Sequence, residues 1–339
     1  MKQAIMKTPG KIEFGEVADP KPGKDEVLMR IHRIGVCGSD VHVWHGQHPY
    51  TSYPVIQGHE FSATIEALGE NVTHFKVGQK VTATPQKVCG ACLPCKRGDY
   101  HICDKLKVEG FQAPGVAQDL FVTRAEKIVP LPDSFSYEQG AFVEPVSVAV
   151  HTVGRVDSLN NENVLVLGAG PIGNLVGQVA RAKGGNVLIT DISDYRLEIA
   201  KKCGLEQTCN VTKQKLSSAL EDAFRGAGYS IAFECVGIEA TMAETIETIG
   251  KGGSIVVVGV FAERPRVDLG LVQDRELKLI GTLMYKYEDY VNAVKLIEEA
   301  KVITEPLYSK HFDFNEYNEA YNYIDGERDK IMKVFIDVN

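Results

Sequence analysis

Four cysteines lie within fifteen residues of one another, at a spacing typical of metal ligands. The motif C-x2-C-x2-C-x7-C is made by Cys89, Cys92, Cys95 and Cys103. Four thiolates so spaced can close a tetrahedron around Zn²⁺ and leave no open position for a substrate. Short cysteine spacings also serve iron–sulfur clusters, but the Cys-Pro that commonly supplies the fourth cluster ligand is missing, and free cysteines are a weaker alternative. The spacing therefore favours a structural zinc ion.

A second set of candidate ligands is dispersed along the first half of the chain. Cys37 occurs in GVCGSD, His59 and Glu60 in GHE, and Glu144 in FVEP. Sulfur, imidazole and carboxylate ligands can hold a zinc ion that keeps a position open and acts as a Lewis acid. Taken singly, a cysteine is often a buried apolar residue, a histidine often packs in a core, and Glu144 could cap a turn. Their joint occurrence predicts a catalytic zinc site.

A glycine-rich motif directly follows the strand-like run NVLVL and opens a helix-like run. In this context the otherwise weak pattern G-x-G-x-x-G predicts a dinucleotide site. Its glycines permit a tight turn, close approach of the backbone to a pyrophosphate, and close packing of helix on strand, while free N–H groups at the helix start can bind phosphate. The alternative is that the glycines only shape a turn. The predicted cofactor-binding residues are Gly168, Gly170, Pro171, Ile172 and Gly173.

An acidic residue closes the next strand-like run, NVLITD. Asp191 lies 23 residues after Gly168, where a carboxylate can accept hydrogen bonds from both ribose hydroxyls of an adenosine. The same carboxylate repels a 2′-phosphate, so the sequence favours NAD over NADP. Arg196 is also a predicted cofactor-binding residue, and because it could help to hold a phosphate it keeps NADP open as the alternative.

The segments that must position these residues are of two kinds. Up to about residue 150, short β-like runs alternate with Pro- and Gly-containing turns, which predicts a mostly β domain. From Asn163 onward, strand-like runs alternate with helical patterns, which predicts a doubly wound parallel sheet. Later, YEDYVNAVKLIEEAKV has helical periodicity and KIMKVFIDVN is strand-like, and we expect this tail to return to the first domain. The fold class is therefore α/β.

Length and composition agree with a two-domain protein and exclude some partners. A chain of 339 residues exceeds what one core usually organises. The net charge of -8, without a Lys/Arg cluster, argues against nucleic acid as a partner. No apolar run is long enough to cross a bilayer and the first residues lack a secretory signal, so we expect no membrane association and a cytoplasmic location. In that reducing environment, clustered cysteines indicate metal binding rather than disulfides.

Together these motifs resemble one family over nearly the whole chain: the zinc-containing medium-chain dehydrogenases, in the branch of the sorbitol, threonine and butanediol dehydrogenases. The most specific elements are GVCGSDVH at 35–42, GHE at 58–60, the four cysteines, EPVSVAVH at 144–151 and GAGPIG at 168–173. The resemblance implies a GroES-like β-barrel catalytic domain at 1–150, with 286–339 returning to it, and a Rossmann NAD-binding domain at 151–285. It also implies a homodimer or homotetramer, formed through the edge of the dinucleotide sheet near GSIVVVGV.

The resemblance also implies roles for individual residues. Cys37 and His59 match ligands of a catalytic zinc ion, Glu60 matches an acidic third ligand, and Glu144 matches a carboxylate that joins or leaves the metal. Ser39 matches the hydroxyl that takes the proton from the alcohol, and His42 matches the histidine that passes the proton toward solvent. Each chain would hold one catalytic and one structural zinc ion and bind NAD.

The implied activity is oxidation of a secondary alcohol of a polyol, sugar alcohol or sugar acid to the ketone. Met284 stands before Tyr285 where a sorbitol dehydrogenase is expected to carry arginine, which argues against sorbitol itself. Trp44, His45, His48 and Tyr50 could line a polar pocket or belong to an exposed loop. The alternatives are a threonine- or butanediol-type dehydrogenase, a zinc-independent quinone or enal reductase, which would lack the dispersed ligand set, and a non-catalytic binding scaffold.

Overall fold

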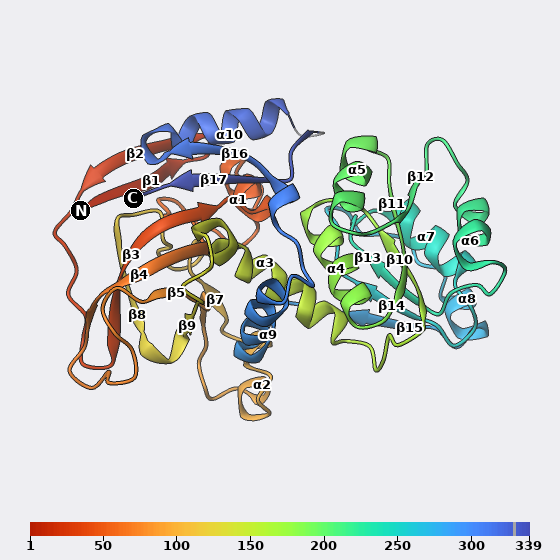
Figure 1. The fold of residues 1–339 in the computed structure, drawn as a ribbon, viewed down its shortest axis with the longest axis horizontal. Helices are drawn as coiled ribbons and strands as arrows, with labels where there is room; N and C mark the ends of the chain where they lie inside the picture. Colours follow the sequence, from red (N-terminus) through yellow and green to blue (C-terminus); the bar gives the residue numbers. More distant parts are fainter. Residues whose placement is uncertain (328–329) are drawn as a thin grey trace. The chain divides into compact units, whose positions relative to one another are not determined.

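The computed structural model describes residues 1–327 and 330–339, which group into two units (Figure 1). The first unit contains both ends of the chain and consists of Met1–Glu144, Lys286–Glu298 and Tyr308–Asn339. The second unit consists of Pro145–Tyr285 and Glu299–Leu307.

This division differs in two places from the boundaries expected from the sequence. The first boundary falls after Glu144, inside helix α3 (Tyr137–Val153), rather than at 150. A continuous helix crosses it, so no change of composition marks the place. The segment 299–307 belongs to the second unit rather than to the returning tail. Gln178 fixes it there, since its side chain accepts the N–H of Ile303 at 2.7 Å and donates to the Ile303 carbonyl at 3.0 Å.

Six parallel strands form the sheet of the second unit, in the order β12-β11-β10-β13-β14-β15. This confirms the doubly wound sheet expected from the alternating pattern. The order reverses between β10 and β13, and ligands of such sheets bind at the carboxyl ends of the strands near that reversal. The strands are β10 (Asn163–Leu167), β11 (Asn186–Asp191), β12 (Gln207–Asn210), β13 (Ile231–Glu234), β14 (Ser254–Val257) and β15 (Lys278–Gly281). The helices between them are α4 (Pro171–Ala182), α5 (Asp194–Lys202), α6 (Leu216–Phe224), α7 (Glu239–Thr248) and α8 (Leu269–Asp274).

The central strands of this sheet are apolar on both faces. Val164, Leu165 and Val166 are fully buried, as expected for parallel strands that are covered on both faces. The run GSIVVVGV forms β14, which pairs with β13 on one side and β15 on the other. The sheet edge that the sequence placed near this run is therefore the more polar neighbouring strand β15. An interior strand reads as more apolar than an edge strand, which explains the difference.

The first unit is built on a seven-stranded sheet in the order β16-β17-β3-β4-β5-β9, with β8 also paired to β3. Two short ribbons, β1 with β2 and β6 with β7, accompany it. The sheet strands are β3 (Glu26–Gly35), β4 (Glu60–Leu68), β5 (Lys80–Ala83), β8 (Leu120–Arg124), β9 (Ile128–Pro130), β16 (Tyr308–Asp313) and β17 (Lys333–Asp337). The ribbon strands are β1 (Lys2–Thr8), β2 (Lys11–Glu16), β6 (Gln86–Lys87) and β7 (Lys107–Val108). The helices besides α3 are α1 (Gly38–Trp44), α2 (Leu93–Lys96), α9 (Tyr287–Glu298) and α10 (Tyr317–Gly326), and short 3-10 turns are η1 (Tyr100–Ile102), η2 (Ala125–Lys127), η3 (Glu305–Leu307, in the second unit) and η4 (Phe314–Glu316).

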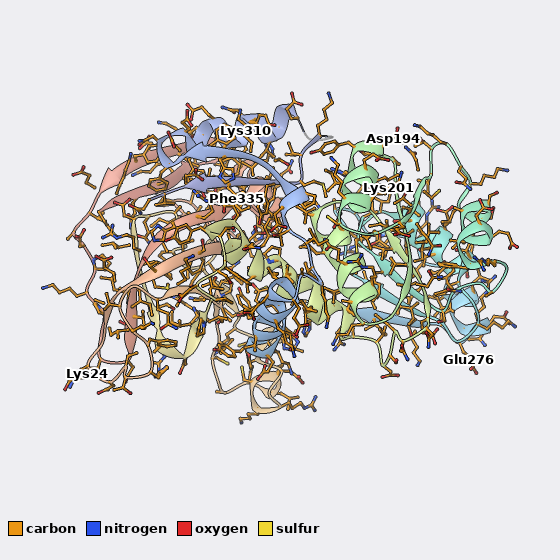
Figure 2. The ribbon with its side chains drawn as sticks, viewed as in Figure 1. Lys24, Asp194, Lys201, Glu276, Lys310 and Phe335 are labelled. Atoms are coloured by element: carbon orange, nitrogen blue, oxygen red, sulfur yellow. The ribbon has the colours of Figure 1, made fainter. Side chains whose placement is uncertain are left out.

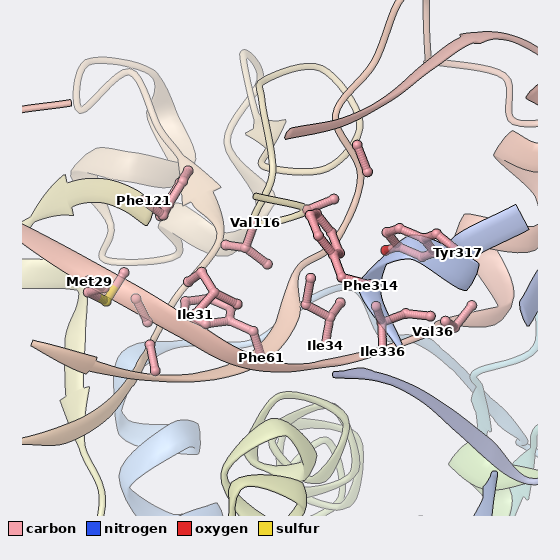
Figure 3. Packing of buried hydrophobic residues seen from close by; sticks show 14 of the residues in the cluster. Met29, Ile31, Ile34, Val36, Phe61, Val116, Phe121, Phe314, Tyr317 and Ile336 are labelled. Atoms are coloured by element: carbon pink, nitrogen blue, oxygen red, sulfur yellow. The ribbon is translucent and has the colours of Figure 1, made fainter. Parts of the chain in front are cut away.

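The core of the first unit lies against the middle of this sheet. Figure 3 shows Ile34 of β3 beside Phe61 of β4 and Ile336 of β17, and all three are buried. Phe335, the next residue to Ile336, is also fully buried, whereas Lys310 of β16 lies at the surface (Figure 2). The strand-like tail of the chain thus returns to the first unit as β17, which pairs antiparallel with β3. In the described part of the chain, no helix has the length and apolar character needed to span a membrane.

Candidate active site

The end of β3 brings three distant parts of the chain to one place. In the antiparallel pairing of β3 with β4, Gly35 lies opposite Glu60, so His59 and Glu60 stand beside the turn that carries Cys37. In the pairing of β3 with β17, the same Gly35 lies opposite Phe335, which places Lys333 nearby. The strand registers, rather than local sequence, therefore assemble the site.

Cys37, His59 and Glu60 each offer a ligand atom, and these atoms all lie within 4.8 Å of one another. We call these three residues the central set. His59 and Glu60 are 5% and 1% exposed. Burial alone would lower the pKa of His59, but Asp40, Cys37 and Glu144 together raise this pKa well above its usual value. The surroundings of the imidazole are therefore strongly negative, and a divalent cation fits both this charge and the sulfur, nitrogen and oxygen donors.

Ser39 and His42, the two residues expected to move the proton, lie on the short helix α1. The Ser39 hydroxyl donates to Cys37 Sγ at 3.1 Å, which places it at the edge of the central set. His42 lies in the last turn of the helix and is exposed to solvent. The helix begins at Cys37, where a capping box with Asp40 fixes the first turn.

Glu144 is buried in α3 but is not among the three residues whose ligand atoms meet within 4.8 Å. Its charge nevertheless contributes to raising the pKa values of His59 and Lys333, so the carboxylate lies within electrostatic reach of both. The structure thus brings Glu60 into the central set and leaves Glu144 as a nearby carboxylate.

A buried lysine that sequence reasoning missed is paired with Glu60. Lys333 Nζ donates to the two carboxylate oxygens of Glu60 at 2.8 and 2.6 Å, and the two side chains are 4% and 1% exposed. Burial alone would lower the pKa of Lys333, but Glu60 and Cys37 raise it, so the ammonium stays charged. A side chain at Gly35 would collide with this pair, since its Cβ would lie 2.5 Å from Glu60 Oε2. The only sequence signal was a charged residue at the start of β17, before its apolar run.

A second missed feature is a chain of polar side chains behind His59. Asp40 is 2% exposed, and its Oδ1 lies 3.6 Å from His59 Nδ1, somewhat beyond hydrogen-bond distance. Asp40 accepts the N–H of Cys37 at 3.0 Å and is contacted by the Gln57 side-chain amide, which in turn accepts the hydroxyl of Tyr321 at 2.8 Å. Because Asp40 stands on the Nδ1 side of the ring, Nε2 is left for an ion.

The four clustered cysteines form a separate site, which we call the cysteine lobe (residues 89–103). Their four sulfur atoms also lie within 4.8 Å of one another, and of the four residues Cys103 is buried. Cys103 Sγ lies 3.5 Å from Cys89 Sγ and 3.8 Å from Cys92 Sγ, close to the ~3.8 Å that a tetrahedron with Zn–S bonds of about 2.3 Å requires. The lobe geometry therefore fits a zinc ion.

Backbone N–H groups point at the sulfur atoms of the lobe. The N–H of Cys92 donates to Cys89 Sγ at 3.4 Å, and the N–H groups of Cys89 and Lys105 donate to Cys103 Sγ, each at 3.3 Å. The N–H groups of Ala91 and Cys92 lower the pKa of Cys89 to about 6. Such donors stabilise thiolates, which are the form that binds metal.

In the second unit, the glycine motif forms the turn between β10 and α4. Gly168 has a φ of 94°, which L side chains rarely adopt, and a Cβ at Gly173 would collide with the Gly168 carbonyl. A Cβ at Gly170 would meet nothing within 4 Å, so the backbone is open to a ligand there. Pro171 and Ile172 begin α4, and the free N–H groups of this helix start face the same turn.

Asp191 ends β11 beside this turn. Its Oδ2 accepts the N–H of Ala169 at 2.7 Å and its Oδ1 accepts the N–H of Ser193 at 2.9 Å. Each oxygen retains a further lone pair for a ribose hydroxyl. Arg196 follows on α5, with its guanidinium 3.9 Å from Asp191 Oδ2. The structure thus brings together the predicted dinucleotide residues at two neighbouring strand-turn-helix units, β10–α4 and β11–α5.

Comparison with known proteins decides the family. Residues 23–133 match the alcohol dehydrogenase GroES-like domain, and residues 171–299 match the zinc-binding dehydrogenase family. A sorbitol dehydrogenase of Halalkalibacterium halodurans is 33% identical over 99% of this chain and 100% of its own length. The chain belongs to the zinc-binding alcohol dehydrogenases. The 2-dehydro-3-deoxy-L-galactonate 5-dehydrogenase of Pseudoalteromonas atlantica is 32% identical, over 96% of this chain and 94% of its own.

Solved structures agree with this family. An alcohol dehydrogenase of Escherichia coli CFT073, complexed with NADH, has a TM-score of 0.92 and 27% identity, and the match covers 100% of this chain and 99% of that chain. The predicted fold, a GroES-like domain with a Rossmann-type parallel sheet, is therefore confirmed, as is the prediction of a dehydrogenase of the zinc- and NAD-dependent type.

The loop residues of this zinc-binding dehydrogenase that could have formed a common pocket separate in the structure. Trp44 is buried and stacks on Tyr321, with ring centroids 4.7 Å apart. His45 pairs with Asp325 of α10 at 2.9 Å, and Tyr50 is 75% exposed. His48 stacks on Phe111, and Phe111 in turn contacts His59 of the central set.

Met284, where the sequence departs from the sorbitol pattern, lies just after β15 in the second unit. Met284 has a φ of 53°, whereas the next residue, Tyr285, is completely buried. A left-handed conformation is uncommon for a long side chain and costs on the order of 1 kcal/mol or more. The backbone after β15 is therefore held by its surroundings in this zinc-binding dehydrogenase.

Proposed function

We propose that this protein oxidises a secondary hydroxyl group of a sugar alcohol or sugar acid to the ketone, with NAD as hydride acceptor. The observation that carries the proposal is the convergence of Cys37, His59 and Glu60 in a buried, negative environment, with the Ser39 hydroxyl beside them. The substrate class is supported by the relatives, which include a sorbitol dehydrogenase and a dehydrogenase of a deoxy sugar acid.

We propose that the central set holds a catalytic zinc ion and that the cysteine lobe holds a structural one. When bound, the catalytic ion acts as a Lewis acid that makes the substrate hydroxyl easier to deprotonate. Glu60 can serve with one oxygen while the other stays with Lys333, because a carboxylate offers two oxygens with two lone pairs each. Glu144 is the carboxylate that joins or replaces it.

The proton of the substrate hydroxyl leaves through α1 in this proposal. A serine hydroxyl has one proton and two acceptor lone pairs, so Ser39 can accept from the substrate and rotate its own proton outward. His42 stands at the exposed end of the same helix, and histidine is the side chain best suited to exchange protons with water near neutral pH. Ser39 is thus a relay, and no strong free base is needed.

The dinucleotide binds the turn after β10 in this proposal. The N–H groups at the start of α4 face its pyrophosphate, and the backbone at Gly170 is open to close approach. Asp191 accepts the ribose hydroxyls and repels a 2′-phosphate, so we infer a preference for NAD, whereas Arg196 supplies the positive charge that a weak use of NADP would need. The bound cofactor accepts the hydride.

We further propose a homodimer or homotetramer formed through the edge strand β15. One side of β15 pairs with β14 and the other is a sheet edge, and such edges invite pairing with another chain. Leu279 on this strand is 39% exposed, Val260 in the loop after β14 is 80% exposed, and Leu269 at the start of α8 is 67% exposed. A cytoplasmic location is the matching proposal for a chain whose eight cysteines are all free thiols.

The test is an absorbance assay for NADH across sugar alcohols, sugar acids, phosphorylated polyols, diols and amino-hydroxy acids, run with both NAD and NADP. We expect turnover of a polyhydroxylated substrate with NAD, and at least about tenfold lower kcat/KM with NADP. Reduction of enals or quinones without any alcohol oxidation would favour the zinc-independent class. Silence across the panel, with zinc bound, would favour a non-catalytic scaffold.

A further inference from the structure

His48 stands one aromatic ring away from the central set. It lies in the loop between α1 and β4, and its ring stacks on that of Phe111 at a centroid distance of 4.7 Å and an interplanar angle of 10°. Phe111 also packs against His59, with ring centroids 4.9 Å apart. A single phenyl ring therefore lies between His48 and a candidate metal ligand.

The position of the His48 ring is fixed by its surroundings. Its Nδ1 is 2.7 Å from the Thr51 hydroxyl within the same loop. The loop is tied to the segment of Phe111, because the side-chain amide of Gln112 donates to the Tyr50 carbonyl at 3.3 Å. His48 is half-buried, so part of its side chain stays accessible.

The ring is suited to be a neutral hydrogen-bonding group. Burial lowers the pKa of His48, and the positive charges that His42 and His59 can carry lower it further. A neutral imidazole has one donor and one acceptor nitrogen. When the Thr51 hydroxyl donates to Nδ1, the proton is on Nε2. Within residues 1–327 and 330–339, no hydrogen bond of the structure engages this Nε2, so it is available as a donor.

We infer that His48 is a specificity-determining residue whose Nε2–H donates to an oxygen of the substrate, a hydroxyl or a carboxylate on a carbon other than the one oxidised. The inference rests on the proposed function and adds to it the group that recognises the rest of the substrate chain. A simple secondary alcohol has no oxygen to offer His48, whereas a sugar alcohol or sugar acid has several. His48 therefore contributes to choosing among alcohols and not to the hydride transfer.

Two conservative substitutions separate this role from a purely structural one. Asparagine places its amide at the level of Nδ1, so His48→Asn keeps the bond to Thr51 and loses the outer donor. Glutamine places its amide at the level of Nε2, so His48→Gln keeps the outer donor and loses the bond to Thr51. If His48 only holds its loop, His48→Asn should keep the activity of the wild type. If His48 recognises the substrate, His48→Gln should keep it instead.

The measurement is the ratio of kcat/KM for the best polyhydroxylated substrate to kcat/KM for the shortest secondary alcohol that the wild type oxidises. We expect this ratio to fall about tenfold in His48→Asn and His48→Leu, because the loss of one hydrogen bond has an effect of about that size. In His48→Gln, which keeps the outer donor, the ratio should fall by less than about threefold. The loss should be in KM for the polyhydroxylated substrate. Thr51→Val serves as the matched control, since it removes only the loop bond, and its ratio should stay near that of the wild type.

Each outcome is decisive. The inference is overturned if His48→Asn keeps the wild-type ratio while His48→Gln or Thr51→Val loses it. It is also overturned if all variants lose activity equally toward both kinds of alcohol while their zinc content and thermal stability stay those of the wild type. A drop on sugar acids much larger than on sugar alcohols identifies a carboxylate as the partner, and equal drops identify a hydroxyl. A wild type that oxidises no alcohol at all refutes the proposed function itself, and that result is read before any variant is made.

Discussion

The two groups of metal-binding side chains are built in opposite ways. The cysteine lobe takes all four sulfur atoms from residues 89–103, and its supporting hydrogen bonds come from backbone N–H groups of the same loop. The central set takes its residues from the end of β3 and the start of β4, and its partner Lys333 comes from the last strand of the chain. One site is local and the other depends on the whole sheet.

Because of this difference, a mutation should have different consequences in the two sites. Four cysteines of one loop, two of them with backbone N–H groups donating to their sulfur atoms, can close around an ion without help from the sheet, which suits a structural role. In the central set, buried charges of both signs are held by strand pairing, so the electrostatics and the fold cannot be changed independently. Losing the lobe ion should therefore cost stability with little loss of kcat. Disturbing the central set should cost activity, and also stability where it leaves a buried charge unpaired.

The largest effect should come from the central set. We expect Cys37→Ser to lower kcat by at least ~1,000-fold, since the loss of a thiolate ligand removes the Lewis acid from the reaction. NADH affinity should change less than about threefold, because the dinucleotide residues lie in the second unit. Stopped assays and NADH fluorescence titration measure the two effects. Retained activity in a preparation of Cys37→Ser shown to bind only the lobe zinc would contradict the assignment.

The next effect should come from the buried ion pair behind the central set. We expect Lys333→Met to lower the free energy of unfolding of the zinc-free protein by about 3–5 kcal/mol, because Glu60 would there be left as an uncompensated buried charge. Denaturant unfolding measures the change.

Two further variants give that experiment its control. Lys333→Arg keeps the positive charge and should lose much less stability than Lys333→Met. The double variant Lys333→Met with Glu60→Gln removes both charges and should recover much of the lost stability, since the cost lies in the unpaired carboxylate. A double variant as unstable as the single one would show that Lys333 acts through packing and not through its charge.

The features that the sequence predicted are those built from residues close together in the chain, as in the cysteine lobe. All four cysteines of the lobe were predicted, because residues 89–103 are close together in the chain. Their grouping can be inferred without knowing how the strands pair. The parallel sheet was predictable because its buried strands are apolar runs between helices, as NVLVL and NVLITD show. Cys37, His59 and Glu60 were recognisable by type, and the structure brings them together.

Residues that act only through strand pairing could not be found this way. Lys333 meets Glu60 because β17 pairs with β3, across almost 300 residues of sequence, and one lysine in a strand-like run ordinarily reads as solvent-facing. Asp40 reads as a helix-capping residue, which it is, and nothing in its neighbours reveals that its other oxygen faces His59. The domain boundary inside α3 and the fixing of 299–307 by Gln178 also depend on tertiary contacts.

The cysteine lobe should respond in the opposite sense to the central set. We expect Cys92→Ser to lower the zinc content from two ions per chain to one and the apparent Tm by about 5 °C, since metal binding there contributes folding energy. The kcat of the protein that remains folded should fall less than about threefold. Metal analysis and thermal unfolding are the measurements. A wild-type protein that is fully stable with only one zinc ion per chain would refute the structural role.

The smallest effect should come from the carboxylate behind His59, and it sharpens the contrast most. Asp40→Asn keeps the size of the side chain and the acceptor for the Cys37 N–H but removes the charge that faces His59 Nδ1. Groups that orient a metal-binding imidazole are typically worth about 10–100-fold in metal affinity. Competition with a chromophoric chelator measures the two zinc affinities separately, because the two ions are released at different free-zinc concentrations. Only one of the two affinities should be lowered. In the lobe, backbone N–H groups donate to the sulfur atoms of Cys89 and Cys103, so this substitution should leave that ion unaffected. If both ions weaken together, the two sites are coupled through the fold, and the separation between local and sheet-dependent assembly does not hold.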